Sequence, residues 1–360
     1  MLNPPFENII MDNSLSTVCQ LASFLDIDNR WRIYFHKDIF STNAEDDSQE
    51  IQQKKESRTS DYHLMRKSQI RFFKLELQLT DVFLIVILLF YSLLACAFNS
   101  RVKSCIFFIL TNLGSILIFL ALIYLHQKIS SRRGRFFLRI SSVSLILIYI
   151  YEASIRLSFI FFRTWQDQSI INLEQKIFGV EPTLWLQEFM SPGLTEWMMI
   201  SYFLYFPLYP IFGAILYFKR GEYKMEDFLF TISINNILCN ICYFLYPVAN
   251  PISHLGHLYS VPLNGYLFTS IGEFIRENLI STGGAMPSGH VAATTIIWLM
   301  AYRYHRHLSY ILAPFVIFIY ISSVYCRFHY VSDIVAGILF SLFIWWMMPF
   351  LRKKLGLDPL

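Results

Sequence analysis

Two short segments of the chain concentrate residue types that could handle a phosphate group. The first is GGAMPSGH, residues 283–290, where Pro287 is expected in the first turn of a helix and Ser288, Gly289 and His290 follow. A helix N-terminus presents unpaired backbone N–H groups and the positive end of the helix dipole, which together favour phosphate. The glycine lets the backbone approach closely, the Ser288 hydroxyl adds a donor, and His290 can supply a proton.

The second segment is CRFHYVSD, residues 326–333. His329 and Asp333 are four residues apart, so on a helix they would share one face. Asp333 could then accept the Nδ1 proton of His329 and leave Nε2 free to attack phosphorus. Arg327 could hold phosphate oxygens through its guanidinium group. With His290 as proton donor, the two segments supply the roles that phosphoryl transfer through a histidine requires.

A simpler interpretation applies to either segment alone. A single histidine at a membrane boundary is ordinarily an interfacial polar residue, and one SGH tripeptide is a weak signal. Two such segments, each at the start of an apolar stretch and on one predicted side, favour catalysis. A transporter or scaffold whose histidines bind or pass ions is the alternative of another class. We find no internal repeat of the kind that many transporters carry.

The elements that must position these residues are membrane helices. Hydrophobic residues make up 55% of the 360 residues and charged residues only 16%, too few to cover a soluble core. The apolar runs have the length that crosses a hydrocarbon layer, which predicts an all-α, polytopic bundle of about eight helices. The predicted spans are 81–98, 105–125, 138–162, 195–218, 227–247, 291–308, 309–326 and 331–350.

The basic residues indicate the orientation of these spans. With a cytoplasmic N-terminus, twelve Lys and Arg residues lie in short cytoplasmic connections and six lie in the longer loops of the other side. The positive-inside rule therefore places both histidine segments on the extracytoplasmic side. Because the net charge of +4 resides in these loops, we expect no nucleic-acid partner. The twelve are Lys128, Arg132, Arg133, Arg135, Lys219, Arg220, Lys224, Arg303, Arg306, Arg352, Lys353 and Lys354, and the six are Arg101, Lys103, Arg163, Lys176, Arg276 and Arg327.

Segments outside the spans carry further expectations. Residues 168–194 are too polar to cross a membrane and are interpreted as interfacial helix pieces or a packed loop, broken by Gly179, Pro182 and Pro192. Residues 1–75 form a polar cytoplasmic region without a cleavable signal peptide. Within it, 41–61 should be disordered and 14–40 could form a short helix or lie on the membrane.

We expect no metal and no cofactor. Cys239 and Cys242 have C-x-x-C spacing, but they lie in an apolar segment without a second pair, so we interpret them as packing side chains. The sequence also offers no carboxylate cluster suited to magnesium.

The PSGH sequence, followed after a helical hairpin by R-x-H-x-x-x-D, resembles the type-2 phosphatidic acid phosphatase superfamily. The resemblance covers about 226–350 and implies that His329 is the nucleophile, Asp333 its partner and His290 the general acid. It also implies that Ser288, Gly289 and Arg327 bind the substrate phosphate. A weaker similarity over 168–250, including YPVANP, extends toward the inositol phosphorylceramide synthase-like branch.

The chain departs from the usual motifs of that superfamily. The last motif ordinarily reads S-R-x5-H, whereas here Cys326 replaces the serine and only Phe328 separates Arg327 from His329. No K-x6-R-P motif precedes PSGH, so the basic phosphate ligands of the hydrolases have no counterpart by motif. The His329–Tyr330 pair resembles the sphingolipid-synthase side of the superfamily, which favours transfer over hydrolysis.

These observations predict an integral-membrane, metal-independent lipid phosphotransferase or phosphatase that acts on a lipid-linked phosphate or phosphodiester through a phosphohistidine. The first alternative is a hydrolytic phosphatase of the phosphatidate or prenyl-pyrophosphate type. The predicted organisation is two additional helices over 76–135, a catalytic membrane domain with a six-helix core over 136–352, and a cytoplasmic tail over 353–360.

Overall fold

A computed structural model describes residues 69–72, 75–278 and 282–355 of the chain. Within these residues the fold is a helical bundle, preceded by one antiparallel pair of short strands, β1 (Gln69–Phe72) and β2 (Leu75–Gln78). The predicted disorder of 41–61 and the predicted helix or membrane contact of 14–40 lie outside the described residues.

Seven helical segments of the described part are long and apolar enough to cross a membrane. This confirms the predicted fold class and makes the chain a multi-pass membrane protein. The spanning segments are α4 (Leu79–Ala97), α5 (Cys105–Lys128), α6 (Arg132–Arg156), the continuous segment α9 (Pro192–Phe203), α10 (Tyr205–Ile215) and η2 (Leu216–Arg220), then α11 (Glu222–Leu245), α15 (Arg306–Tyr325) and α16 (Val331–Lys354).

The predicted span 291–308 is a shorter helix than expected. It corresponds to α14 (Gly289–Tyr304), whose 16 residues extend about 24 Å at 1.5 Å per residue. The helix ends where His305 interrupts it, and α15 begins at Arg306. Helix α14 packs against α11, α15 and α16, and most of its side chains from Val291 to Ala301 are buried. A helix enclosed by its neighbours need not match the lipid thickness.

Helix α6 is displaced toward the N-terminus from its predicted range of 138–162. Arg139, which lies at the start of the predicted range and inside the observed helix, has its guanidinium buried within the bundle. Nη1 of Arg139 lies 2.6 Å from Oδ1 of Asp81, and Nε lies 2.7 Å from Oε1 of Glu226. Paired charges can be accommodated where a single charge would be costly, so the helix continues through this position.

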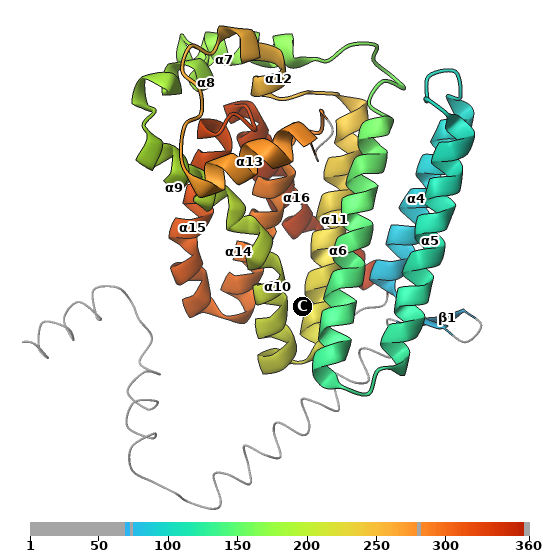
Figure 1. Ribbon diagram of the computed structural model, residues 1–360. Coiled ribbons are helices and arrows are strands. Elements are labelled where there is room, and N and C mark those ends of the chain that lie inside the picture. The colour runs from blue at the N-terminus through green and yellow to red at the C-terminus, as the bar shows by residue number, and fades with distance from the viewer. Residues whose placement is uncertain (1–68, 73–74, 279–281, 356–360) are drawn as a thin grey trace, which may run out of the picture. The chain divides into compact units, whose positions relative to one another are not determined.

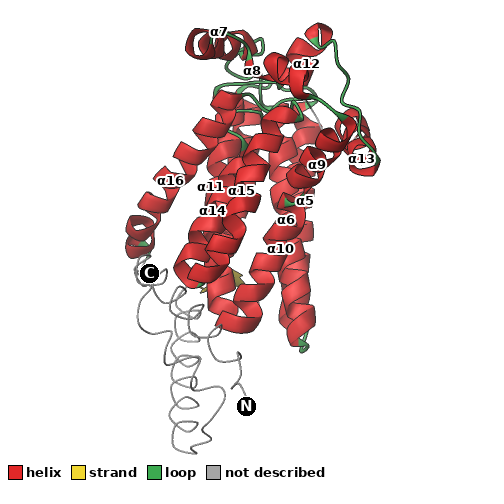
Figure 2. Cartoon of the chain, turned by 90° about the vertical axis from the view of Figure 1, so that its left-hand side faces the viewer, coloured by secondary structure: helices red, strands yellow, loops and turns green. Residues whose placement is uncertain are grey.

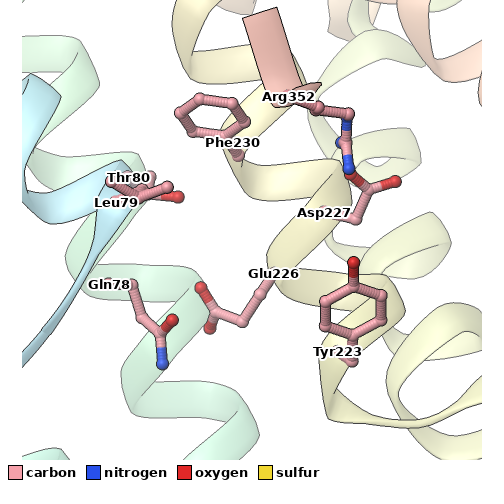
Figure 3. Close-up of a pocket in the computed structure, with 8 residues that line it drawn as sticks. All are labelled: Gln78, Leu79, Thr80, Tyr223, Glu226, Asp227, Phe230 and Arg352. Carbon is pink, nitrogen blue, oxygen red and sulfur yellow. The ribbon is translucent and has the colours of Figure 1, made fainter. Parts of the chain in front are cut away.

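A second buried charge cluster lies next to the first, because Asp227 follows Glu226 on α11 (Figure 3). Arg352, in the last turn of α16, forms an ion pair with Asp227, which also accepts a hydrogen bond from the Tyr304 hydroxyl. A cavity of about 30 Å³ lies beside this pair. Because α16 begins at Val331 and ends at Lys354, this cluster and the CRFHYVSD segment occupy opposite ends of one helix.

Short helices cover the end of the bundle where α14 and α16 begin (Figures 1 and 2). Helix α7 ends at Gly179, which adopts a left-handed φ of 76°, and Pro182 and Pro192 begin the next helices. The predicted helix pieces within 168–194 are therefore confirmed as helices with these breaks. The covering elements are α7 (Asp167–Phe178), α8 (Pro182–Trp185), η1 (Leu186–Phe189), α12 (Pro251–Leu255), η3 (Gly256–Leu258) and α13 (Leu267–Asn278).

Candidate active site

His329 lies in the connection between α15 and α16, two residues before the first residue of α16. The expectation that His329 and Asp333 share a helical face is therefore wrong, because only Asp333 belongs to the helix. The two side chains meet because Asp333 folds back to cap α16, where its Oδ2 accepts the backbone N–H of Tyr330 at 2.9 Å. The same oxygen lies 3.5 Å from Nδ1 of His329.

The closest partner of the His329 ring is a backbone carbonyl. Nδ1 lies 3.0 Å from the oxygen of Ala285, in the segment that leads into α14. Because a carbonyl can only accept, Nδ1 carries the proton and Nε2 keeps its lone pair. Burial lowers the pKa of His329 to about 4, although the bond to Ala285 opposes this shift. At neutral pH the imidazole is uncharged, as a nucleophile must be.

His290 approaches His329 from the start of α14. The two ring centres are 6.3 Å apart, and the rings are inclined by 58°. Ser288 is the N-cap of α14, since its Oγ accepts the N–H of Val291 at 3.4 Å, and Gly289 is the first helical residue. Pro287 therefore precedes the cap, and the expectation that it lies in the first turn is wrong.

Close packing at two glycines fixes the start of α14 against α11 and α16. A Cβ on Gly289 would lie 2.7 Å from the Tyr243 hydroxyl, and a Cβ on Gly337 would lie 2.8 Å from the carbonyl oxygen of Ser288. The N–H of Ser288 donates to the backbone oxygen of Asp333 at 3.0 Å. The starts of α14 and α16 are thus joined directly, main chain to main chain.

Arg327 belongs to the same loop, but its recorded contacts lead to the covering segments. Its guanidinium donates to the carbonyl of Val261 at 2.6 Å and to the sulfur of Met190 at 3.2 Å, and its Cζ lies 3.8 Å from the centre of the Tyr259 ring. Only 2% of Arg327 is exposed, and Nε has no hydrogen-bond partner. Within the described part of the chain no carboxylate lies within ion-pair distance of Arg327.

The structure therefore brings together His329, His290, Asp333, Ser288 and Gly289. The printed contacts of the Arg327 side chain are instead with Val261, Met190 and Tyr259, and its Nε has no hydrogen-bond partner. The hydroxyl of Ser288 is buried and serves as a helix cap. Burial also lowers the pKa of Arg327 from its ordinary value. A buried cation with no carboxylate within ion-pair distance favours an anionic ligand nearby.

Two sets of residues in the site were not found from the sequence. The first is Asp167, which opens α7: its Oδ1 accepts the Tyr330 hydroxyl at 2.9 Å and its Oδ2 accepts the N–H of Ala249 at 2.8 Å. Val248, the neighbour of Ala249, accepts the N–H of Ala285 at 3.2 Å. Because Asp167 stands far from both motifs in the chain, no spacing pattern marks it.

The second set is aromatic and surrounds His290. Tyr202 and Tyr205 each lie 4.8 Å from the His290 ring centre, and Phe206 lies 5.7 Å away. The hydroxyl of Tyr202 is 3.3 Å from Nδ1 of His290. In an apolar span such residues look like ordinary membrane-helix side chains, so the sequence carries no signal for them.

The chain was compared with a family model, a curated relative and a solved structure. The family model described as the PAP2 superfamily matches residues 168–347. The chain is 27% identical over 106 residues to a PA-phosphatase related-family protein of Dictyostelium discoideum, a match that covers 28% of this chain and 19% of the relative. It is similar, at 18% identity and a TM-score of 0.35, to the crystal structure of a transmembrane PAP2 type phosphatidylglycerolphosphate phosphatase from Bacillus subtilis, over 60% of this chain and 96% of that one. The match to half of its length shows that the chain belongs to the PAP2 superfamily, which supports a membrane lipid phosphatase-type function.

Proposed function

We propose that the chain transfers or removes the phosphate-bearing group of a membrane lipid, without a metal ion, through a phosphohistidine at Nε2 of His329. The observation that carries this proposal is the pair of histidine rings 6.3 Å apart, with Nδ1 of His329 bound to Ala285. That hydrogen bond leaves Nε2 as the attacking atom, and the second histidine stands at the distance where a phosphorus atom can lie between them.

The reaction has two steps, formation and breakdown of the phosphohistidine. In the first, Nε2 of His329 bonds to phosphorus, the bond from phosphorus to the leaving oxygen breaks, and His290 gives that oxygen its proton. Burial lowers the pKa of His290 to about 3, so His290 holds this proton only when the anionic phosphate beside it raises the pKa. In the second, the oxygen of water or of an acceptor hydroxyl bonds to phosphorus and the N–P bond breaks. His290 takes the proton of the incoming hydroxyl and is restored.

The phosphate oxygens need positive partners, and the described residues offer two kinds. The first-turn N–H groups of α14, at Gly289 and His290, form a helix N-terminus capped by Ser288. Arg327 is the buried cation whose Nε lacks a partner. We propose that both contact the phosphate.

We further propose that the preferred reaction is transfer to a lipid hydroxyl from a phosphodiester donor, as in the inositol phosphorylceramide synthase-like branch. Support comes from the missing K-x6-R-P motif and from the His329–Tyr330 pair. Hydrolysis of a lipid phosphomonoester is the alternative, because water can take the place of the acceptor in the second step.

A substrate screen tests the proposal. Purified protein in detergent with excess EDTA is given phosphatidic acid, a prenyl pyrophosphate and labelled phosphatidylinositol, each with and without ceramide or diacylglycerol as acceptor. A labelled acceptor lipid would support transfer, whereas free phosphate from phosphomonoesters alone would establish hydrolysis. Inactivity of folded protein on the whole panel would favour a transporter or scaffold.

The two histidines should differ in a labelling experiment. With a phosphate-labelled donor, His329→Ala should abolish both turnover and the acid-labile label on the protein. His290→Ala should slow formation and breakdown of the label by about 10²–10⁴-fold. A label that survives His329→Ala would reverse the assignment.

We propose that the site opens on the extracytoplasmic side, as the distribution of basic residues favours. A cysteine introduced within 252–275, after removal of the native cysteines, should react with an impermeant thiol reagent in intact cells. Labelling only after lysis would place the site on the cytoplasmic side.

A further inference from the structure

Helix α13 turns its apolar side away from the protein. Its buried residues are Thr269 and Gly272, and the sulfur of Met199 from α9 would lie 2.6 Å from a Cβ on Gly272. Its outer side carries Leu267, Phe268, Ile271 and Phe274, which are 37% to 64% exposed. This arrangement is the reverse of a helix that covers a soluble core, and it is typical of a helix in contact with lipid.

The outer side of α13 continues into the spanning segment Pro192–Arg220 through aromatic contacts. The ring centre of Phe268 lies 6.3 Å from that of Phe203, and Phe203 lies 5.7 Å from Phe206. Phe206 is 51% exposed in a segment long and apolar enough to cross a membrane, an exposure that is typical of a side chain in contact with lipid. The apolar surface is therefore continuous from α13 to the bilayer.

The same surface reaches the candidate active site, because Phe206 lies 5.7 Å from the ring centre of His290. His290 is only half-buried, so the aromatic row leads from lipid to a reachable catalytic side chain. On the inner side of α13, Arg276 lies 5.3 Å from the Phe328 ring and donates to the carbonyl of Cys326 at 3.3 Å. Helix α13 thus contacts both the lipid-facing surface and the catalytic loop.

We propose that Phe268, Phe203 and Phe206 form the seat for a hydrocarbon chain of the lipid substrate, which enters sideways from the bilayer along α9, α10 and α13. The inference rests on the proposed function for the identity of the reacting group, but the seat itself depends only on a hydrocarbon chain. A chain lying on this row directs its headgroup toward His290, since the row ends there. The row thereby selects lipids by their chains.

Kinetics with two phosphatidic acids test the seat. The variant Phe268→Ser should lower kcat/KM for the dioleoyl lipid in mixed micelles by about tenfold, through KM, since it removes apolar contact with the chain. Turnover of the dioctanoyl lipid, whose short chains depend little on the row, should stay within about twofold. Phe107→Ser is the matched control, because Phe107 is a lipid-exposed phenylalanine on α5 and is 61% exposed. Equal losses for both lipids, or an equal loss in the control, would overturn the proposal.

Cross-linking tests whether the hydrocarbon chain binds at these residues, independently of turnover. Phosphatidic acid with a diazirine in one acyl chain is irradiated with His329→Ala protein in detergent micelles, and the modified residues are mapped. Modification concentrated on α9, α10 and α13, and reduced by Phe206→Ser, supports the seat even if no lipid of the panel is turned over. Modification spread evenly over the exposed apolar residues of α5 and α16 as well would show ordinary boundary lipid and reject it.

Discussion

The hydroxyl of Tyr330 donates a hydrogen bond to the carboxylate of Asp167 at 2.9 Å, and this bond joins the residue after the proposed nucleophile to helix α7. Asp167 also accepts the N–H of Ala249, so one buried carboxylate holds two of the segments around His329, those of Tyr330 and Ala249. A third segment contacts His329 directly, because the carbonyl of Ala285 accepts the hydrogen bond from Nδ1 of His329.

Replacing Asp167 by alanine should therefore impair the chemical step. We expect kcat to fall by about 10²-fold with KM within about twofold, because a displacement of about 1 Å at a reacting group has an effect of this size. Asp167→Asn keeps one hydrogen-bond acceptor, so its kcat should lie between those of the wild type and Asp167→Ala. Gln168→Ala, at the exposed next position, is the control. If purified Asp167→Ala protein were less stable but retained kcat, Asp167 would have only a structural role.

Asp333 contacts both the backbone N–H of Tyr330 and the ring of His329, and one substitution can distinguish the effects of these two contacts. An asparagine at this position can still accept the N–H of Tyr330 and cap α16, but it lacks the charge that faces His329 at 3.5 Å. Attack by Nε2 places positive charge on the imidazole, so Asp333→Asn should slow formation of the labelled intermediate by about 10²-fold or more. The thermal midpoint should change little. Unchanged labelling would reduce Asp333 to a helix cap.

The sequence predicted most of the spans and the two histidines that meet in the candidate site, because both are local signals. Apolar runs mark α4, α5 and α16 within a few residues, and the PSGH and R-x-H-x-x-x-D motifs each occupy one short segment. The range predicted for α6 began at 138 because the basic residues before it interrupt the apolar run. Arg135 nevertheless belongs to the helix and pairs with Glu222 on α11, a contact that a single segment cannot reveal.

The supporting residues of the site were not predictable for a similar reason. Asp167 acts through contacts with segments far along the chain, and nothing in its neighbourhood distinguishes it from other acidic residues in loops. The aromatic residues of α9 and α10 resemble those of any membrane helix until packing places them on His290. The role of His329 was derived from helix spacing, whereas its tautomer depends on the carbonyl of Ala285, which no spacing rule indicates.

Glu174 should make the stability of the protein depend on pH. Its Oε1 accepts the N–H of Ser332 at 2.6 Å, its Oε2 is buried without a partner, and burial raises its pKa from 4.5 to about 7. A raised folded-state pKa means that stability is full below about 4.5 and is lost as the pH rises through about 7. Glu174→Gln retains an acceptor for Ser332 without a charge to bury.

We therefore expect Glu174→Gln protein to match the wild type in thermal midpoint at pH near 4.5 and to exceed it at pH 8. Scanning calorimetry in detergent across this range gives the comparison. Glu188→Gln, which changes an exposed carboxylate of η1, should show no pH-dependent difference. A Glu174→Gln midpoint below that of the wild type at pH 8 would show that the charged form stabilises the fold.

Arg139 should matter for stability and little for chemistry. Its replacement by methionine leaves Asp81 and Glu226 buried without their cation, which should destabilise the folded protein by about 3–5 kcal/mol. Denaturation in detergent measures this loss, and Arg133→Met on the exposed side of α6 is the control. Since the cluster and His329 occupy opposite ends of the bundle, the fraction of variant that stays folded should keep its kcat. A loss of kcat without a loss of stability would contradict this separation.

Gly337 should tolerate no side chain, because α16 passes close to the start of α14 there. An added Cβ would lie 2.8 Å from the carbonyl oxygen of Ser288 and 3.3 Å from Cγ1 of Val291. The first contact is with main chain that begins the PSGH helix, so relief requires α14 and α16 to move apart. That movement stretches the bond from the Ser288 N–H to the Asp333 carbonyl, which is 3.0 Å long.

Gly337→Ala should therefore cost about 1–3 kcal/mol in stability, as overpacking does, and should lower kcat together with it. Gly114→Ala on α5 is the matched control, because a Cβ there meets nothing within 4 Å and alanine favours a helix by about 1 kcal/mol. Adding Val291→Ala to Gly337→Ala should not restore kcat, since it removes only the side-chain contact and leaves the clash with the Ser288 carbonyl. Recovery in that double variant would show that the side chain, and not the main chain of the PSGH segment, sets the distance between the two helices.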